Sequence, residues 1–111
     1  MGRLVSAEAI GEAVREGRWS MSYHAHGRAG KRRIGDEELV LALAGGEILE
    51  DYPDDPRGAS ALVLGRIADG RWVHGVCAFD PGGDLVVITT YVPELPKWLD
   101  ERTRAPRDKE G

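Results

Sequence analysis

The residues whose types and spacing could do chemistry gather in one basic window of the sequence. No aspartate or glutamate occurs between Glu16 and Asp36. The cations of this window are Arg18, Arg28, Lys31, Arg32 and Arg33, and the rings among them are Trp19, Tyr23, His24 and His26. Cations interleaved with rings are what a ligand made of phosphates and bases requires. The window therefore predicts an RNA-binding surface, with Arg18, Lys31 and Arg33 as binding residues.

The same window could cleave a phosphodiester without a metal ion. RNA supplies its own nucleophile, the 2′-hydroxyl, so the protein needs a base, an acid and cations for the phosphate. His24 titrates in the useful pH range, and Arg28 and Arg32 offer planar forks to phosphate oxygens. If 24–33 is helical, these three residues share one face. Tyr91, at the end of the last predicted strand, could donate a phenolic proton or stack on a base.

Ordinary structural roles remain open for each of these side chains. A histidine can cap a helix, arginines can be solvated surface groups, and a sheet tyrosine can pack on Trp98. The segment 36–60 follows at once and carries a net charge of −7, so the basic window could pair with it instead of a ligand. The same charge split also allows a homodimer in which the window of one copy meets the acidic segment of another.

Other chemistries are less favoured by the sequence. The His24-x-His26 spacing puts two rings on one face of a strand, and His74 could complete a three-ligand site. Because five cations surround this stretch, a divalent metal is disfavoured, and we expect neither a metal nor a cofactor. Cys77 lies in an apolar run and is expected to be a core residue rather than a nucleophile. Phosphate-loop and Gly-x-Ser-x-Gly motifs are absent.

The elements that must position these residues come in a simple order, with helices first and strands afterwards. Helices are predicted at 7–16, capped by Ser6, and at 36–44, where acidic residues open the first turn. The segment 24–33 is undecided between helix and loop, because Gly27 and Gly30 weaken a helix. Strands are predicted at 47–52, 61–67, 71–79 and 84–92, the last of them central and covered on both faces. Trp98 is expected to fold back onto the sheet as a cap.

This pattern predicts an α+β fold with N-terminal helices packed on one antiparallel sheet of about four strands. The 111 residues, 41% hydrophobic and 31% charged, fit a single domain over 1–101 followed by a mobile polar tail over 102–111. The net charge is only −4, so the cationic surface is local. No apolar run approaches the roughly 20 residues of a membrane helix, and no signal peptide is evident. With a single cysteine, these features predict a cytoplasmic protein without a membrane partner.

Several short motifs occur in an order that resembles a small bacterial family of domains of unknown function. They begin with His24-Ala25-x-x-Arg28, followed by Arg32 and Ile34, and continue with Gly46-Glu47-Ile48-Leu49-Glu50, Tyr52-Pro53-Asp54-Asp55 and Leu62-Val63-Leu64-Gly65. They end with His74, then Thr90-Tyr91-Val92-Pro93, then Trp98. The likeness covers roughly residues 7–98. Two positions depart from the usual pattern, with Ala29 in place of Met and Arg33 in place of Gly.

That family in turn resembles the RelE/MqsR-like ribonuclease toxins of toxin–antitoxin systems. The resemblance implies a RelE/barnase-like fold, RNA cleavage without a metal, and a cognate antitoxin of the zinc-finger type as partner. It implies that His24, Arg28, Arg32 and Tyr91 are the catalytic residues, with His74 as a further candidate. Our leading hypothesis is therefore a toxin-type endoribonuclease. The alternative is a non-catalytic module that uses the basic window to bind RNA or an acidic protein.

Overall fold

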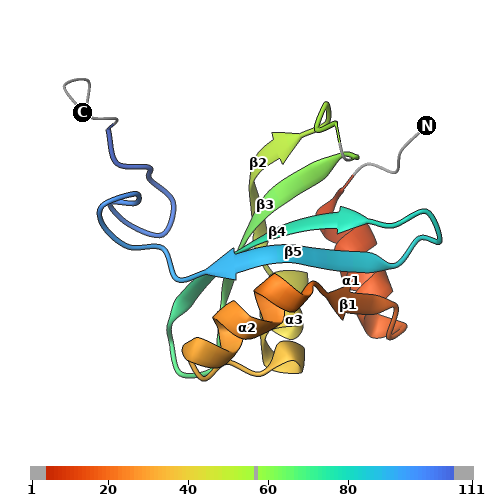
Figure 1. Ribbon diagram of the computed structural model, residues 1–111, viewed down its shortest axis with the longest axis horizontal. Helices are drawn as coiled ribbons and strands as arrows, with labels where there is room; N and C mark the ends of the chain where they lie inside the picture. The colour runs from red at the N-terminus through yellow and green to blue at the C-terminus, as the bar shows by residue number, and fades with distance from the viewer. Residues whose placement is uncertain (1–4, 57, 107–111) are drawn as a thin grey trace.

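A computed structural model describes residues 5–56 and 58–106 (Figure 1). Along the chain the elements are α1 (Ala7–Arg15), β1 (Trp19–Met21), α2 (Tyr23–Lys31), α3 (Asp36–Ala44), β2 (Glu47–Tyr52), β3 (Ser60–Arg66), β4 (Trp72–Phe79) and β5 (Leu85–Tyr91). None of the helices in these ranges is long and apolar enough to cross a membrane. The structure is thus an α+β fold, as predicted.

The undecided segment of the basic window is a helix, α2. Ser22 caps it, since its side-chain oxygen accepts a hydrogen bond from the backbone nitrogen of Ala25 at 2.9 Å. Ala25 and Ala29, one turn apart, are its buried residues. Gly27 and Gly30 lie on the exposed side, where a methyl group on either glycine would meet no neighbouring atom within 4 Å. Burial of the two alanines thus outweighs the weak helix propensity of the glycines.

The sheet has five strands in the order β1-β5-β4-β3-β2, so the prediction of about four antiparallel strands was incomplete. The meander from β2 to β5 is antiparallel, as expected. The additional strand β1 is parallel to β5, with Trp19 opposite Leu85 and Met21 opposite Val87. A strand of three residues has no readable period, and its partner lies more than 60 positions away in the chain. The sheet is therefore mixed, and its likeness to the RelE/barnase fold stays a prediction.

The helices cover one face of the sheet and form the main core with it (Figure 1). Cys77 is fully buried there, as predicted, and burial raises the pKa of its thiol to about 12. Helix α3 lies so close to β3 that a methyl group on Gly65 would be 2.6 Å from the carbonyl oxygen of Ala42. The strand buried along almost its whole length is β3, whereas β5 alternates between buried and half-buried residues. The predicted two-sided burial thus belongs to β3.

The opposite face of the sheet, here called the open face, is covered at one end by residues 98–106. Trp98 is buried there with its ring against His74, which confirms that it caps the sheet. Arg102 and Arg104 form ion pairs with Glu47 and Glu50 of β2. The domain's contacts thus extend past residue 101, through the described part of the segment predicted to be a mobile tail. Residues 107–111 of that segment lie outside the described residues.

Helix α2 ends in a Schellman motif that places a non-glycine residue in the left-handed region. The backbone nitrogen of Ile34 bonds the carbonyl of Ala29 at 2.9 Å, and that of Arg33 bonds the carbonyl of Gly30 at 3.0 Å. Arg33 has φ = 58°, a conformation that glycine adopts without steric cost. This is the position at which the sequence departs from the glycine of the family pattern.

We predict that Arg33→Gly raises the free energy of unfolding by about 0.5–1 kcal/mol, since it removes the left-handed strain. Urea denaturation followed by circular dichroism measures the change. As a matched control, Arg28→Gly replaces an arginine within α2 and should lower stability by about 0.5–1 kcal/mol. A destabilised Arg33→Gly variant would contradict the account of this turn.

Candidate functional site

Three of the predicted site residues, Arg28, Arg32 and Tyr91, line one groove of about 360 Å³. We call it the arginine groove. Its remaining lining residues are Val92, Glu94, Leu95, Pro96, Lys97, Trp98 and Arg104. One wall belongs to α2, the floor to the end of β5, and the far wall to the segment that follows β5. Within the described ranges, four cations and one carboxylate line it, so their net charge suits an anion.

Ser22 fixes the position of α2 beside β5. Its backbone nitrogen donates to the carbonyl of Val87 at 3.0 Å, and its hydroxyl donates to the carbonyl of Ile88 at 2.6 Å. Because the same hydroxyl caps α2, the helix starts where β1 leaves the edge of β5. The helix then runs beside the second half of β5, which brings Arg28 and Arg32 next to Tyr91.

The cations of the arginine groove differ in their partners. Arg32 pairs with Glu94 at 2.9 Å, and Arg104 pairs with Glu50 through two nitrogens at 2.7 and 2.8 Å. The side chains of Arg28 and Lys97 make no hydrogen bond or ion pair with any residue in the described ranges. Arg28 is exposed, so its guanidinium is available to a ligand without breaking an internal contact.

His24 lies one helical turn before Arg28 but lines a second groove, of about 590 Å³. We call it the hydroxyl groove, after Ser22, Tyr52, Ser60 and Thr89, which line it together with Asp55, Val76 and Ile88. Thr89 and Tyr91 alternate along β5 and therefore face the same side of the sheet. The two grooves thus follow one another along α2 and β5. His24 therefore lines one groove and Arg28, Arg32 and Tyr91 line the next one along α2 and β5.

His74 is fully buried behind Tyr91 and does not reach either groove. The carbonyl oxygen of Glu101 lies 2.7 Å from Nε2 and can only accept, so Nε2 carries the proton. Nδ1 then accepts the phenolic proton of Tyr91 at 3.2 Å. Burial lowers the pKa of His74, which keeps the ring neutral near pH 7. Because its proton is held by His74, Tyr91 offers the groove a ring for stacking rather than an acid.

A network of Glu50, Tyr52 and Arg104 spans the open face and was missed by the sequence analysis. Tyr52 donates a hydrogen bond to Glu50, and the hydrogen bonds from Arg104 lower the pKa of Glu50 to about 2. The pKa of Tyr52 is raised, first by burial and then by its bond to Glu50. Glu50 and Tyr52 alternate on β2, which is readable from the sequence. Their partner, Arg104, comes from the segment predicted to be a mobile tail, so this contact could not be read from the sequence.

The acidic segment therefore pairs mainly with the C-terminal arginines instead of the basic window. Among the described residues, the window reaches that segment through one pair, His26 with Asp36 at 2.8 Å. Arg18 pairs with Glu16 at 2.7 Å and lines neither groove. Lys31 and Arg33 are exposed at the end of α2 without partners in the described ranges. With Arg28 they leave a cationic surface beside the arginine groove.

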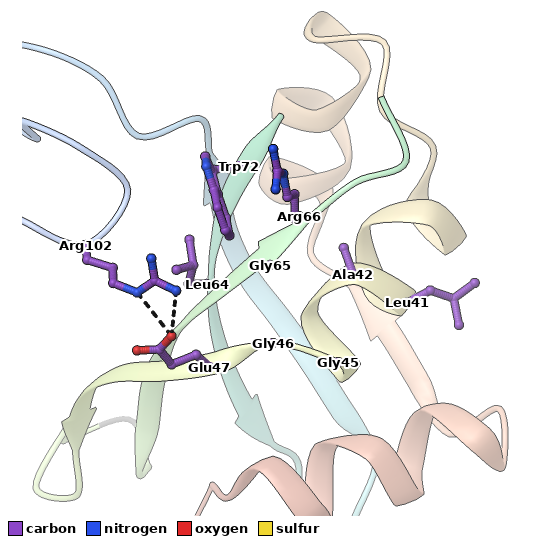
Figure 2. Close-up of a pocket in the computed structure, with 10 residues that line it drawn as sticks. All are labelled: Leu41, Ala42, Gly45, Gly46, Glu47, Leu64, Gly65, Arg66, Trp72 and Arg102. Carbon is purple, nitrogen blue, oxygen red and sulfur yellow. Dashed lines mark hydrogen bonds and ion pairs between the residues drawn. The ribbon is translucent and has the colours of Figure 1, made fainter. Parts of the chain in front are cut away.

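A third groove, of about 350 Å³, lies where α3 ends beside β3 (Figure 2). The ring of Trp72 has the guanidinium carbons of Arg66 and Arg102 at 4.8 and 5.4 Å from its centroid. Arg102 is held by Glu47 at 3.0 Å, as the dashed lines in Figure 2 show. None of the predicted site residues lines this groove. Its aromatic ring and its charged groups are already in contact with one another, so we do not assign this groove to the functional site.

A family model described as "Domain of unknown function (DUF4258)" matches residues 21–92. The chain belongs to this family. The match confirms the predicted family of unknown function, while kinship with RelE/MqsR-like toxins stays a prediction. No curated protein and no solved structure matches the chain. The DUF4258 range includes α2 and β5, and it ends before Glu94, so most of the far wall of the arginine groove lies beyond it.

The buried His74 predicts a pH dependence of stability. Its pKa is lower in the folded domain than in the unfolded chain, so between these values the unfolded chain binds a proton that the folded one does not. Stability is therefore full above about pH 6.5 and falls as the pH drops through the folded pKa. Urea denaturation at pH 7, 6 and 5 should show this loss. Glu50 contributes only at lower pH, between about 4.5 and 2.

In the same experiment, His74→Gln should flatten the dependence of unfolding free energy on pH, even though the variant is less stable overall. His24→Ala, which removes an exposed histidine, should keep the wild-type slope. A His74→Gln variant with the wild-type slope would contradict the assignment of a buried neutral imidazole.

Proposed function

We propose that this domain is a metal-independent endoribonuclease of the toxin type that cleaves RNA through its 2′-hydroxyl. The observation that carries the proposal is the arginine groove, in which Arg28, Arg32 and Tyr91 meet, with His24 one helical turn away on the same side of α2. His24 and Arg28 have no partner among the described residues. Both side chains are therefore free to act on a ligand.

Each residue of the site has a separate role in the proposed cleavage of RNA. His24 takes the proton of the 2′-hydroxyl as that oxygen forms a bond to phosphorus. The bond from phosphorus to the 5′-oxygen breaks, and the leaving oxygen is protonated by the imidazolium or by water, which leaves a 2′,3′-cyclic phosphate. Arg28 binds the phosphate oxygens as a planar fork, and Arg32 joins it when the phosphate displaces Glu94. The ring of Tyr91 stacks on a base.

One observation favours the alternative, a non-catalytic RNA-binding module. Since the phenolic proton of Tyr91 is held by His74, His24 is the remaining exposed group of the predicted set that could act as a general base or acid. A domain with the same two grooves could therefore bind RNA without cleaving it. The zinc-finger antitoxin partner and the homodimer stay predictions under both functions.

We predict that the purified protein cleaves a labelled single-stranded RNA in the presence of EDTA and leaves cyclic-phosphate ends. His24→Ala should lower the cleavage rate by roughly 100-fold or more, because it removes the general base. Gel electrophoresis resolves the products, and treatment with a cyclic phosphodiesterase identifies their ends.

His26→Ala is the matched control, because it removes the second histidine of α2, whose ring faces Asp36. It should retain wild-type cleavage. RNA that is bound but left intact under these conditions would exclude the nuclease and leave the binding module. Activity that is unchanged in both variants would point to a contaminating nuclease, and activity lost equally in both would point to a general loss of structure.

We predict that Glu94→Gln strengthens RNA binding by about threefold to fivefold at low salt, since it frees Arg32 from an exposed ion pair. Fluorescence anisotropy with a labelled oligonucleotide measures the affinity. Glu37→Gln changes the net charge equally, from an exposed site that lines neither groove, and should have a smaller effect. If Glu94→Gln still helps when Arg32 is alanine, Arg32 is not the phosphate ligand.

A further inference from the structure

The hydroxyl groove has the chemistry of a site for an uncharged, partly apolar ligand. Val76 and Ile88 supply apolar surface from β4 and β5. The half-buried hydroxyl of Thr89 and the exposed ring of His24 have no hydrogen-bond partner among the described residues. The groove thus combines an apolar surface with two polar groups that remain free to bind.

Charge separates this groove from its neighbour. Among the described residues, four cations line the arginine groove, whereas no lysine or arginine lines the hydroxyl groove. The described residues of the first groove therefore attract a phosphate, and those of the second supply no cation to bind one. A base with its ribose, which carries no charge, suits the second groove.

The spacing of the grooves matches a repeating polymer. From Thr89 to Tyr91 the strand advances two residues, about 6.6 Å, and from His24 to Arg28 the helix advances about 6 Å. A single step along an extended nucleic acid strand covers a similar distance. One nucleotide unit therefore has about the length needed to reach from one groove to the next along both α2 and β5.

We propose that the hydroxyl groove is a nucleoside subsite, so that the ligand is an RNA strand with a base and ribose beside His24 and Thr89 and the adjoining phosphate at Arg28. This deepens the proposed function and rests on it, because it takes the arginine groove as the phosphate site. The base lies over Val76 and Ile88, and the Thr89 hydroxyl bonds its edge. His24 is then next to the ribose whose 2′-hydroxyl it must deprotonate.

The experiment compares inorganic phosphate with uridine 3′-monophosphate by calorimetry and by amide chemical shifts. The nucleotide should bind at least tenfold more tightly than phosphate, and it alone should shift the amides of Val76 and Thr89. Thr89→Val keeps the shape of the side chain and should weaken nucleotide binding by about fivefold, with phosphate binding unchanged. Thr103→Val, outside both grooves, is the control and should change neither affinity.

Val76→Phe fills the groove and is a second variant, which should abolish the preference for the nucleotide. If phosphate and RNA bind but neither variant changes nucleotide binding, the subsite is overturned and the proposed function stands. If no probe binds the wild type, both fail. If the nucleotide binds as described and RNA is not cut, the subsite is supported and the nuclease activity is excluded.

Discussion

The hydrogen-bonding requirement of one buried histidine determines how the site is built. His74 is fully buried and neutral, so both of its ring nitrogens need partners inside the protein. Tyr91 satisfies Nδ1 and the backbone carbonyl of Glu101 satisfies Nε2, while the indole of Trp98 packs against the ring at a centroid distance of 4.4 Å. These contacts hold the segment after β5 against the sheet. Together with the ion pairs of Glu94 and Arg104, they fix the position of the far wall of the arginine groove.

The same contacts explain how an acidic protein keeps a cationic groove. Glu47 and Glu50, from the most acidic part of the chain, are paired with Arg102 and Arg104 at the end of the open face. The basic window is therefore left largely unpaired along α2, where Arg28 remains free to bind an anion. The net charge of −4 conceals this separation, because the groove depends on where the charges lie and which of them pair.

Local patterns predicted most of the fold. The Ser6 cap predicted where α1 begins, and the acidic first turn predicted where α3 begins. The β-rich runs predicted the four strands of the meander. The prediction was incomplete for those elements that depend on contacts between residues distant in the sequence. The burial of Ala25 and Ala29 decides that α2 is a helix, β1 exists only through its pairing with β5, and a polar end segment is bound by β2. The spacing of His24, Arg28 and Arg32 was readable once α2 is helical, whereas the hydroxyl groove joins α2 to residues of four strands and the loop after β2.

The central claim is that RNA lies along α2 and β5, with a phosphate at Arg28. The most direct test is a crystal structure of the protein with a short oligonucleotide whose 2′-hydroxyls are methylated, so that it can bind but cannot be cut. We expect a phosphate within hydrogen-bond distance of the Arg28 guanidinium and the adjoining ribose beside His24. A strand bound instead in the groove around Trp72, with the arginine groove empty, would contradict it.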